Sequence, residues 1–253
     1  MPENGFPVKN ANNIPLQMPL YDDPFVPYQV ADMPCLCIYC RAAPGVIEKY
    51  LEPTPFEFVS SDFVVSAADM MNTGHTTGGF YDVALVVTIQ YKGRRYGYYL
   101  FEYEQDDYCV CAGRELWGYP KKMATGNLVK KGGKIIANLV RNGVEFLRLE
   151  MDPEKPPQDD LPNPVIHPHL NIQVMPNCDG PGIFSKRILL RDTSADFVRK
   201  SKTTGEGKIT LKSTHNNPIG EFTPVKIYGA SYEIGDYFAT PANGWAKVLE
   251  TLV

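Results

Sequence analysis

The sequence predicts a mainly β protein of the α+β class, built as a single antiparallel β-rich domain with a few short helices. Two observations support this prediction. The 253 residues include 22 prolines, 15 tyrosines and 12 phenylalanines, and turn signals recur between short apolar segments. Proline interrupts helices, whereas aromatic side chains favour strands. Without an internal repeat or a low-complexity tract, one closed or sandwich-like domain fits best.

The chain divides into an N-terminal arm and a folded domain. We expect residues 1–27 to form an extended arm because prolines interrupt them throughout, and residues 28–253 to form the β-rich domain. The first element with a helical pattern is Val46–Leu51, which follows a Pro-Gly pair and ends before Pro53.

Glycine-containing dipeptides predict tight turns in the first half of the domain. Lys92-Gly93, Gly132-Gly133 and Asn142-Gly143 each separate two apolar segments, as in β-hairpins. The strands predicted here are Asp62–Ala68, Phe80–Tyr91, Arg94–Glu104, Asn127–Lys131, Lys134–Val140 and Val144–Met151.

The second half begins with a proline-rich loop over residues 152–168, after which strand patterns resume. The spacing of apolar residues predicts two helices, a short one over Ser194–Lys202 and a terminal one over Asn243–Leu252. The strands predicted here are Leu170–Met175, Ile183–Leu190, Lys208–Lys212 and Pro224–Ile234.

Composition excludes several classes of function. The formal net charge of −4 argues against a nucleic-acid partner, which requires a basic surface. The longest apolar run, Val83–Ile89, is far shorter than the roughly 20 residues of a membrane span, so no membrane association is expected. The polar, proline-rich start does not resemble a signal peptide, and we therefore expect a cytoplasmic protein.

Three motifs suggest binding sites only weakly. The six cysteines at 35, 37, 40, 109, 111 and 178 lack paired CxxC motifs, and reduced cysteines are common in protein cores. Cys35 and Cys37 would share one strand face, as would Cys109 and Cys111. His167-Pro168-His169 has no evident carboxylate partner, and Lys202–Lys208 lacks the pattern of a phosphate-binding loop. We expect no metal and no cofactor.

The segment Gly113–Met123, with sequence GRELWGYPKKM, carries the chemistry. Two adjacent lysines follow a proline among aromatic and apolar residues. A lysine must be neutral to attack a carbonyl, and at pH 7 only about one unperturbed lysine in 2,500 is neutral. Burial or a neighbouring ammonium group favours the neutral amine. A rigid, apolar segment around a lysine therefore indicates a nucleophile.

Gly113–Met123 resembles the active-site segment of the acetoacetate decarboxylase family, whose pattern is roughly G-R-E-L-x-[AG]-[FY]-P-K-K. Pro168 to Gly180 is similar to the family's downstream proline, apolar strand and I-P-x-x-D-G turn, and Glu52-Pro53-x-Pro55 to its L-x-P segment. The resemblance spans roughly residues 20–250. It implies a partly closed, cone-like or barrel-like double sheet and assembly as a homo-oligomer.

The resemblance implies a role for each lysine of the pair. Lys121 forms an imine (Schiff base) with a carbonyl substrate, and Lys122 tunes or positions it. In an extended strand the two side chains point to opposite faces. We therefore expect desolvation to influence Lys121 more than Lys122 does, and Lys122 to pair with an acid elsewhere. Tyr119 and Tyr81 are expected hydroxyl donors, and Trp117 a further substrate contact.

The chain departs from the family at three polar positions. Asp82 stands where the family has a glutamate, 39 residues before Lys121, and we expect it to move protons. A second family glutamate, further upstream, falls on Ala67. The family's carboxylate-binding arginine is missing from Tyr28 to Met33, which leaves Met33 as a substrate contact and Arg41 as the nearest arginine. Loss of this arginine predicts poor acetoacetate turnover.

We therefore expect a carbon–carbon lyase that acts on a small keto acid or another enolisable carbonyl compound. The imine is an electron sink, so deprotonation gives an enamine that attacks an aldehyde and then loses water. This aldolase–dehydratase chemistry is favoured. Two alternatives stay open: decarboxylation of a 3-oxo acid with release of CO₂, and a non-enzymatic β-barrel that binds a small ligand.

Overall fold

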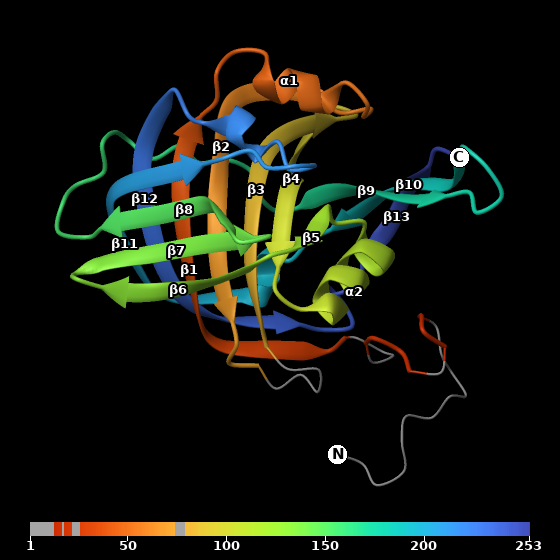
Figure 1. Cartoon of the computed structure of the whole chain (residues 1–253), viewed down its shortest axis with the longest axis horizontal. Helices are drawn as coiled ribbons and strands as arrows, with labels where there is room; N and C mark the ends of the chain where they lie inside the picture. Colours follow the sequence, from red (N-terminus) through yellow and green to blue (C-terminus); the bar gives the residue numbers. More distant parts are fainter. Residues whose placement is uncertain (1–12, 17, 22–25, 74–78) are drawn as a thin grey trace, which may run out of the picture.

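A computed structural model describes residues 13–16, 18–21, 26–73 and 79–253. It is mainly β, as predicted, and thirteen strands form one sheet (Figure 1). The strands are β1 (Tyr28–Arg41), β2 (Glu57–Met70), β3 (Phe80–Tyr91), β4 (Arg94–Glu104), β5 (Lys121–Met123), β6 (Thr125–Lys131), β7 (Lys134–Arg141), β8 (Val144–Asp152), β9 (His169–Pro176), β10 (Ile183–Arg191), β11 (Phe197–Leu211), β12 (Lys226–Ala239) and β13 (Lys247–Thr251). The helical segments are α1 (Val46–Leu51), α2 (Asp107–Trp117) and the 3₁₀ turns η2 (Ser194–Asp196) and η3 (Ile219–Phe222).

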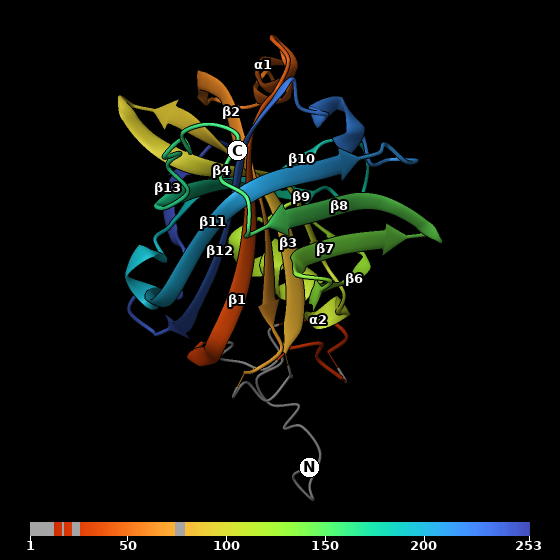
Figure 2. The same cartoon turned by 90° about the vertical axis from the view of Figure 1, so that its left-hand side faces the viewer.

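The strands follow the order β13-β10-β9-β4-β3-β2-β1-β12-β11-β8-β7-β6, with β5 beside β4. Over the described residues this path does not close on itself. Neighbours pair antiparallel except at two places, where β4 runs parallel to β5 and to β9. The long strands curve strongly, and the meander β6–β8 crosses them (Figure 2).

The predicted turns are confirmed. Both residues of each turn dipeptide have positive φ: 49° and 76° at Lys92-Gly93, 59° and 76° at Gly132-Gly133, and 51° and 75° at Asn142-Gly143. This left-handed conformation matches the right-handed twist of the flanking strands, which explains why glycine ends each pair.

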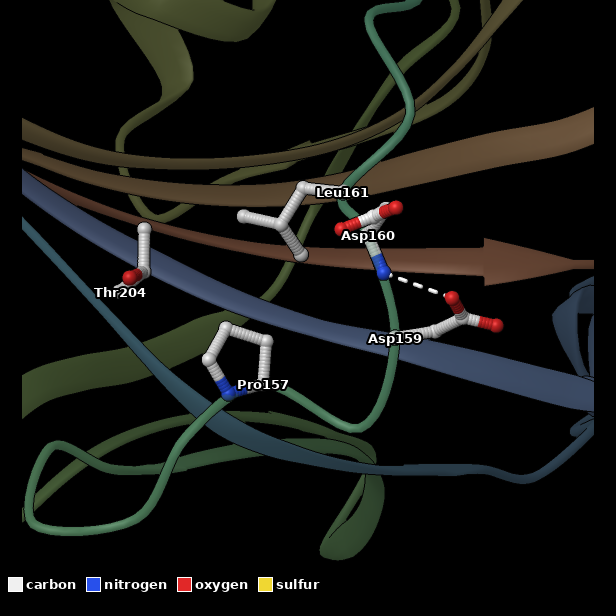
Figure 3. Close-up of a pocket in the computed structure, with 5 residues that line it drawn as sticks. All are labelled: Pro157, Asp159, Asp160, Leu161 and Thr204. Atoms are coloured by element: carbon white, nitrogen blue, oxygen red, sulfur yellow. Dashed lines mark hydrogen bonds between the residues drawn. The ribbon is translucent and has the colours of Figure 1, made fainter.

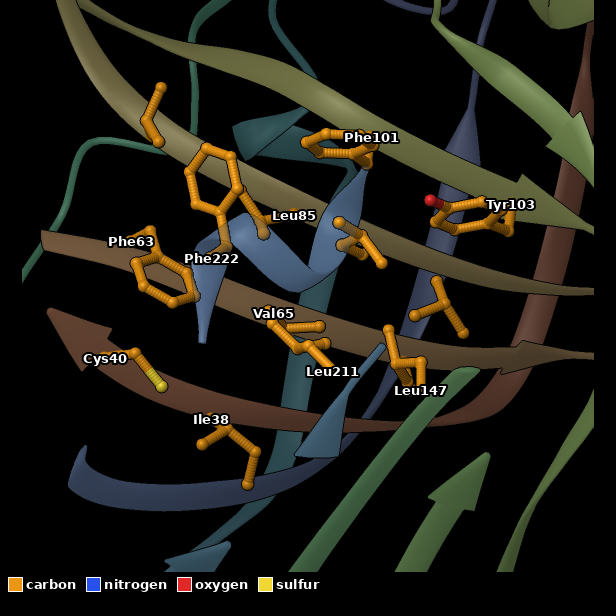
Figure 4. Packing of buried hydrophobic residues seen from close by; sticks show 14 of the residues in the cluster. Ile38, Cys40, Phe63, Val65, Leu85, Phe101, Tyr103, Leu147, Leu211 and Phe222 are labelled. Carbon is orange, nitrogen blue, oxygen red and sulfur yellow. The ribbon is translucent and has the colours of Figure 1, made fainter. Parts of the chain in front are cut away.

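The main hydrophobic core lies between the long strands and the segments that cross them. Phe222 of η3 packs edge-on against Phe63 of β2 and Phe101 of β4, with ring centroids 5.7 and 5.6 Å apart (Figure 4). Leu147 of β8 belongs to the same cluster. This core covers one face of β1–β4, so their opposite face is available for a functional site.

Two predicted helices are wrong. Residues 243–252 contain the edge strand β13, which pairs with β10, and residues 194–202 contain only the short turn η2 before β11 begins. In both places, pairing with a neighbouring strand outweighs the weak helical periodicity. The helix α2 lies where no helix is predicted, and it carries Cys109 and Cys111, which therefore do not lie on a strand.

The predicted arm falls largely outside the described residues. Among those that are described, Val26 and Tyr21 are buried in a cluster with Trp117 and Tyr119. No helix of the described chain has the length and apolar character needed to cross a membrane.

Candidate active site

Strand pairing places Lys121 and three carboxylates on one face of the sheet. Asp82 on β3 lies opposite Glu104 on β4, and β5 places Lys121 beside Glu102. Residues two apart on a strand share a face, so Glu102 and Glu104 both point toward Lys121. We call Asp82, Glu102 and Glu104 the acidic cluster.

A β-bulge sets this arrangement. The register of the β3–β4 hairpin shifts between Leu85 and Val86. If the register of the turn continued without the shift, Asp82 would lie opposite Tyr103 instead of Glu104. A one-residue shift moves every later side chain to the other face of a strand. The bulge therefore turns the two glutamates away from the core and toward the lysine.

The ammonium group of Lys121 lies inside the acidic cluster. Its Nζ donates a hydrogen bond to Glu104 Oε1 and lies 3.5 Å from Glu102 Oε1. Oxygens of the three carboxylates lie within 4.8 Å of one another. Lys121 is 7% exposed, Glu102 2% and Glu104 0%. Asp82 Oδ1 and the second oxygens of both glutamates have no hydrogen-bond partner in the described chain, so the cluster can still accept protons.

Burial and the neighbouring charges shift the pKa of all four groups. Burial lowers the pKa of Lys121, but Glu102, Glu104 and Asp82 together raise it well above its usual value. Burial is the largest single influence, as expected, yet the resting amine is an ammonium. Burial also raises the pKa of Asp82, of Glu102 and of Glu104, the last to about 7, and the nearby Lys121 opposes each increase. Glu104 can therefore gain or lose a proton near neutral pH.

Gly113 makes room for the lysine. A Cβ at this position of α2 would lie 2.4 Å from Lys121 Cδ and 2.6 Å from Cε. The helix ends at Gly118, whose left-handed conformation (φ 68°) turns the chain into Tyr119-Pro120 and β5. The GRELWGYPKK segment thus forms a helix, a turn and a short strand that fix one lysine.

Lys121, Asp82 and Glu102 line a pocket of about 580 Å³, within the range of small-molecule sites, and Glu104 is buried behind them. Three of the predicted substrate contacts, Met33, Trp117 and Tyr119, line this pocket. The Tyr119 ring centroid lies 5.2 Å from Lys121 Nζ. Cys35 also faces the pocket, and its Sγ lies 3.8 Å from that of Cys37, so these two do share a strand face.

Two of the predicted site residues do not line the pocket. Tyr81 is 2% exposed and belongs to the core, because it alternates with Asp82 along β3. Lys122 pairs with Tyr103 on the core side of β4, and its Nζ donates to the backbone carbonyl of Asn216 rather than to an acid. Burial, Arg141 and Arg114 lower the pKa of Lys122.

Sequence reasoning missed Glu102, Glu104 and Arg191. The two glutamates were visible as an alternating pair at the end of a predicted strand, but only the bulge turns them toward Lys121. Arg191, at the end of β10, is 6% exposed and lines the pocket. Arg191 supplies positive charge to the pocket, although residues 28–33, where the family has its carboxylate-binding arginine, contain none. Arg191 belongs to β10, which is far from that segment in the sequence.

A second hollow of the described chain has no lysine, histidine or cysteine in its lining. Pro157, Asp159, Asp160, Leu161 and Thr204 line a shallow hollow, where Asp159 Oδ1 accepts a hydrogen bond from the Asp160 amide (Figure 3). The acidic cluster is the group of described residues whose spacing could hold a metal ion, but the Lys121 ammonium already supplies positive charge there.

Comparisons with known proteins show the family to which the chain belongs. The acetoacetate decarboxylase (ADC) family model matches residues 14–243. The acetoacetate decarboxylase of Burkholderia multivorans is 25% identical over 225 residues, covering 88% of this chain and 89% of that protein.

Solved structures share the fold. An acetoacetate decarboxylase structure superposes with a TM-score of 0.82 at 19% identity, covering 97% of both chains. The enduracididine biosynthesis enzyme MppR, solved with the condensation product of pyruvate and imidazole 4-carboxaldehyde, gives a TM-score of 0.75 at 15% identity, covering 98% of this chain and 99% of that one. Because the family model spans most of the sequence, the protein belongs to the acetoacetate decarboxylase family.

Proposed function

We propose that this protein is a carbon–carbon lyase in which Lys121 forms an imine with a small keto compound. The observation that carries the proposal is the buried Lys121 ammonium, held by two glutamates at the wall of a pocket. Lysine imines need no further electron sink, which agrees with the expectation that no cofactor takes part.

The acidic cluster gives the ammonium a route to the neutral amine. Glu104 accepts a hydrogen bond from Lys121 Nζ, and its raised pKa of about 7 makes it a better base than an ordinary glutamate. Transfer of one proton from Nζ to Glu104 leaves a neutral amine that attacks the substrate carbonyl. The protonated glutamate then returns the proton to the carbinolamine hydroxyl, which leaves as water and gives the protonated imine.

Asp82 is placed for the next proton transfer. It borders the pocket, and burial raises its pKa. As a carboxylate it removes a proton from the carbon next to the imine, and the electron pair flows into the C=N bond to give an enamine. The enamine carbon then bonds to the carbonyl carbon of an aldehyde, loss of water follows, and hydrolysis releases Lys121.

Charge at the lysine favours this aldolase–dehydratase chemistry over decarboxylation of acetoacetate. The carboxylate of acetoacetate would lie close to the imine, beside three acids that share the single cation of Lys121. At about 4 Å, two like charges repel by about 4 kcal/mol at an effective dielectric constant near 20. The similarity to MppR, solved with a condensation product, supports the same direction.

Lys122 remains a positioning residue in this proposal. Its hydrogen bond to the Asn216 carbonyl ties β5 to the loop before η3, which holds the neighbouring Lys121 in register. Assembly as a homo-oligomer also stays a prediction.

Exchange of the substrate's α protons tests the proposal. In D₂O, a keto compound that forms the enamine gains deuterium, observed by NMR, and an added aldehyde gives an unsaturated condensation product. Release of CO₂ from acetoacetate without exchange of a simple ketone would favour the decarboxylase alternative instead. Binding without either reaction would identify a ligand-binding barrel and contradict the proposal.

A further inference from the structure

We infer that Arg191 forms a carboxylate-binding subsite at the end of the pocket away from the acidic cluster, and that the substrate is a keto acid whose carboxylate stays bound there during the reaction. The inference rests on the proposed function, because it names the substrate class of the same pocket.

The hydrogen-bond partners of Arg191 are all uncharged. Its Nη1 donates to the Tyr119 hydroxyl at 3.0 Å, its Nη2 to the Tyr237 hydroxyl at 3.4 Å, and its Nε to the Gly244 carbonyl at 3.0 Å. The guanidinium carbon lies 4.3 Å from the Trp117 ring centroid. These contacts orient the planar group, but none of them is with a carboxylate.

No carboxylate of the described chain forms an ion pair with Arg191. Asp196 feels its charge, since burial raises the pKa of Asp196 and Arg191 opposes that increase, but neither Asp196 oxygen has a hydrogen-bond partner in the described chain. Asp196 also does not line the pocket, whereas Arg191 does. A buried charge is unfavourable unless an opposite charge or several polar groups compensate it. An anionic ligand in the pocket would complete the site.

Two histidines determine the direction of the hydrogen bonds at the Arg191 end of the pocket. His169 Nε2 lies 2.7 Å from the Tyr119 hydroxyl, and His167 Nδ1 lies 3.2 Å from His169 Nδ1. Burial and Arg191 lower the pKa of both rings, to about 4 for His167. Since Arg191 donates to the Tyr119 oxygen, we assign the Tyr119 O–H to donate to neutral His169. Tyr119 is then a wall of the subsite and not a hydroxyl donor to the substrate.

The charged groups of Lys121 and Arg191 lie beside different parts of the Tyr119 side chain. Lys121 Nζ lies 5.2 Å from the Tyr119 ring centroid, whereas Arg191 bonds to the Tyr119 hydroxyl. A keto acid spans this arrangement with its carbonyl at Lys121 and its carboxylate at Arg191. The opposite orientation, with the carboxylate near Lys121, is unfavourable. Among the described residues, Lys121 is the only cation at that end of the pocket, and it already interacts with three acids.

This geometry selects a class of keto acid. A carboxylate next to the keto carbon would lie among the acids, so the substrate needs a spacer of several carbons between the two groups. Arginine binds carboxylates through two parallel hydrogen bonds and favours the charged form. The bound carboxylate is therefore retained while bonds change at the carbon next to the imine.

A pair of ligands of equal length tests the subsite. We would titrate 5-oxohexanoate and its uncharged counterpart 2-hexanone, reduce with borohydride and measure the adduct by intact mass. Wild-type protein should reach half-saturation with the acid at a concentration about 10- to 100-fold lower. Arg191→Gln should lose this preference and still trap 2-hexanone, which also shows that it folds. Arg191→Lys should keep part of the preference for the acid. Arg187→Gln, an exposed arginine on the same strand, is the control.

An NMR titration with hexanoate separates this inference from the proposed function, because hexanoate has no carbonyl. Wild type and Arg187→Gln should bind hexanoate at least tenfold more tightly than Arg191→Gln. If no imine forms with any ketone but hexanoate binding depends on Arg191, the subsite stands and the proposed function fails. If Arg191→Gln retains both the preference for the acid and the binding of hexanoate, the subsite is contradicted.

Discussion

Asp82 and Glu104 face each other across β3 and β4 because a single bulge shifts the register between them and the turn. Both carboxylates then point to the side of the sheet where β5 presents Lys121. The chemistry of the site thus depends on a feature of the backbone that contains none of the reacting groups.

Glu104→Gln should slow formation of the imine by about 100-fold or more, the lower end of the usual contribution of general acid–base catalysis. The amide keeps the shape of the side chain but cannot take the proton of Lys121. Rapid quenching with borohydride gives the rate. Glu221→Gln, at an exposed position paired with Lys49, is the control. Imine formation at the wild-type rate in Glu104→Gln would exclude Glu104 as the base.

The rate of imine formation in the wild-type protein should rise with pH through about 7. Burial raises the pKa of Glu104 to about 7, and only its carboxylate form can accept the proton, so the rate falls as pH drops below that value. The same profile measured for Glu104→Gln should lack this limb. If the rate for Glu104→Gln fell below pH 7 in the same way, the titrating group would be a different residue.

Lys121→Ala should destabilise the fold by about 3–5 kcal/mol at pH 8, the usual cost of removing one partner of a buried ion pair. The loss should be smaller at pH 5. Without the ammonium, the folded-state pKa values of the acidic cluster rise further above their unfolded values, so stability decreases as pH rises through that window. Urea unfolding at both pH values measures this. Lys122→Ala should show no such pH dependence, and an equal loss at both pH values in Lys121→Ala would contradict the account.

Gly113→Ala should impair imine formation without unfolding the protein. The added Cβ would overlap the Lys121 side chain, whereas alanine favours a helix over glycine by about 1 kcal/mol. Borohydride trapping should therefore fall at least tenfold while the denaturation midpoint changes little. Gly180→Ala is a suitable control because a Cβ there meets nothing within 4 Å. Normal trapping in Gly113→Ala would show that the lysine tolerates displacement.

The sequence predicted the β-rich fold and several turns because those signals are local. Asn142-Gly143 favours the left-handed conformation through its own residue types, and it adopts that conformation here at the turn of the hairpin. The terminal helix was wrong for the opposite reason. The apolar residues of Asn243–Leu252 fit a helix, but pairing with β10, which lies far away in the sequence, makes Lys247–Thr251 a strand.

In the candidate site, too, local sequence signals predict some residues, whereas others depend on long-range strand pairing. Lys121 and Asp82 were found from short motifs and a resemblance, whereas Glu102 and Glu104 required knowledge of the bulge. Arg191 comes from β10 and reaches the pocket only because β9 and β10 lie beside β4 in the sheet. No local pattern in the sequence reports that long-range arrangement.

Mapping of a borohydride-reduced adduct tests the central claim most directly. The protein is incubated with 5-oxohexanoate or 2-hexanone, reduced, digested and analysed by mass spectrometry. The account predicts a reduced adduct on Lys121, present in Lys122→Ala and absent from Lys121→Ala. An adduct on Lys122 or another lysine, or no adduct with any keto compound, would contradict it.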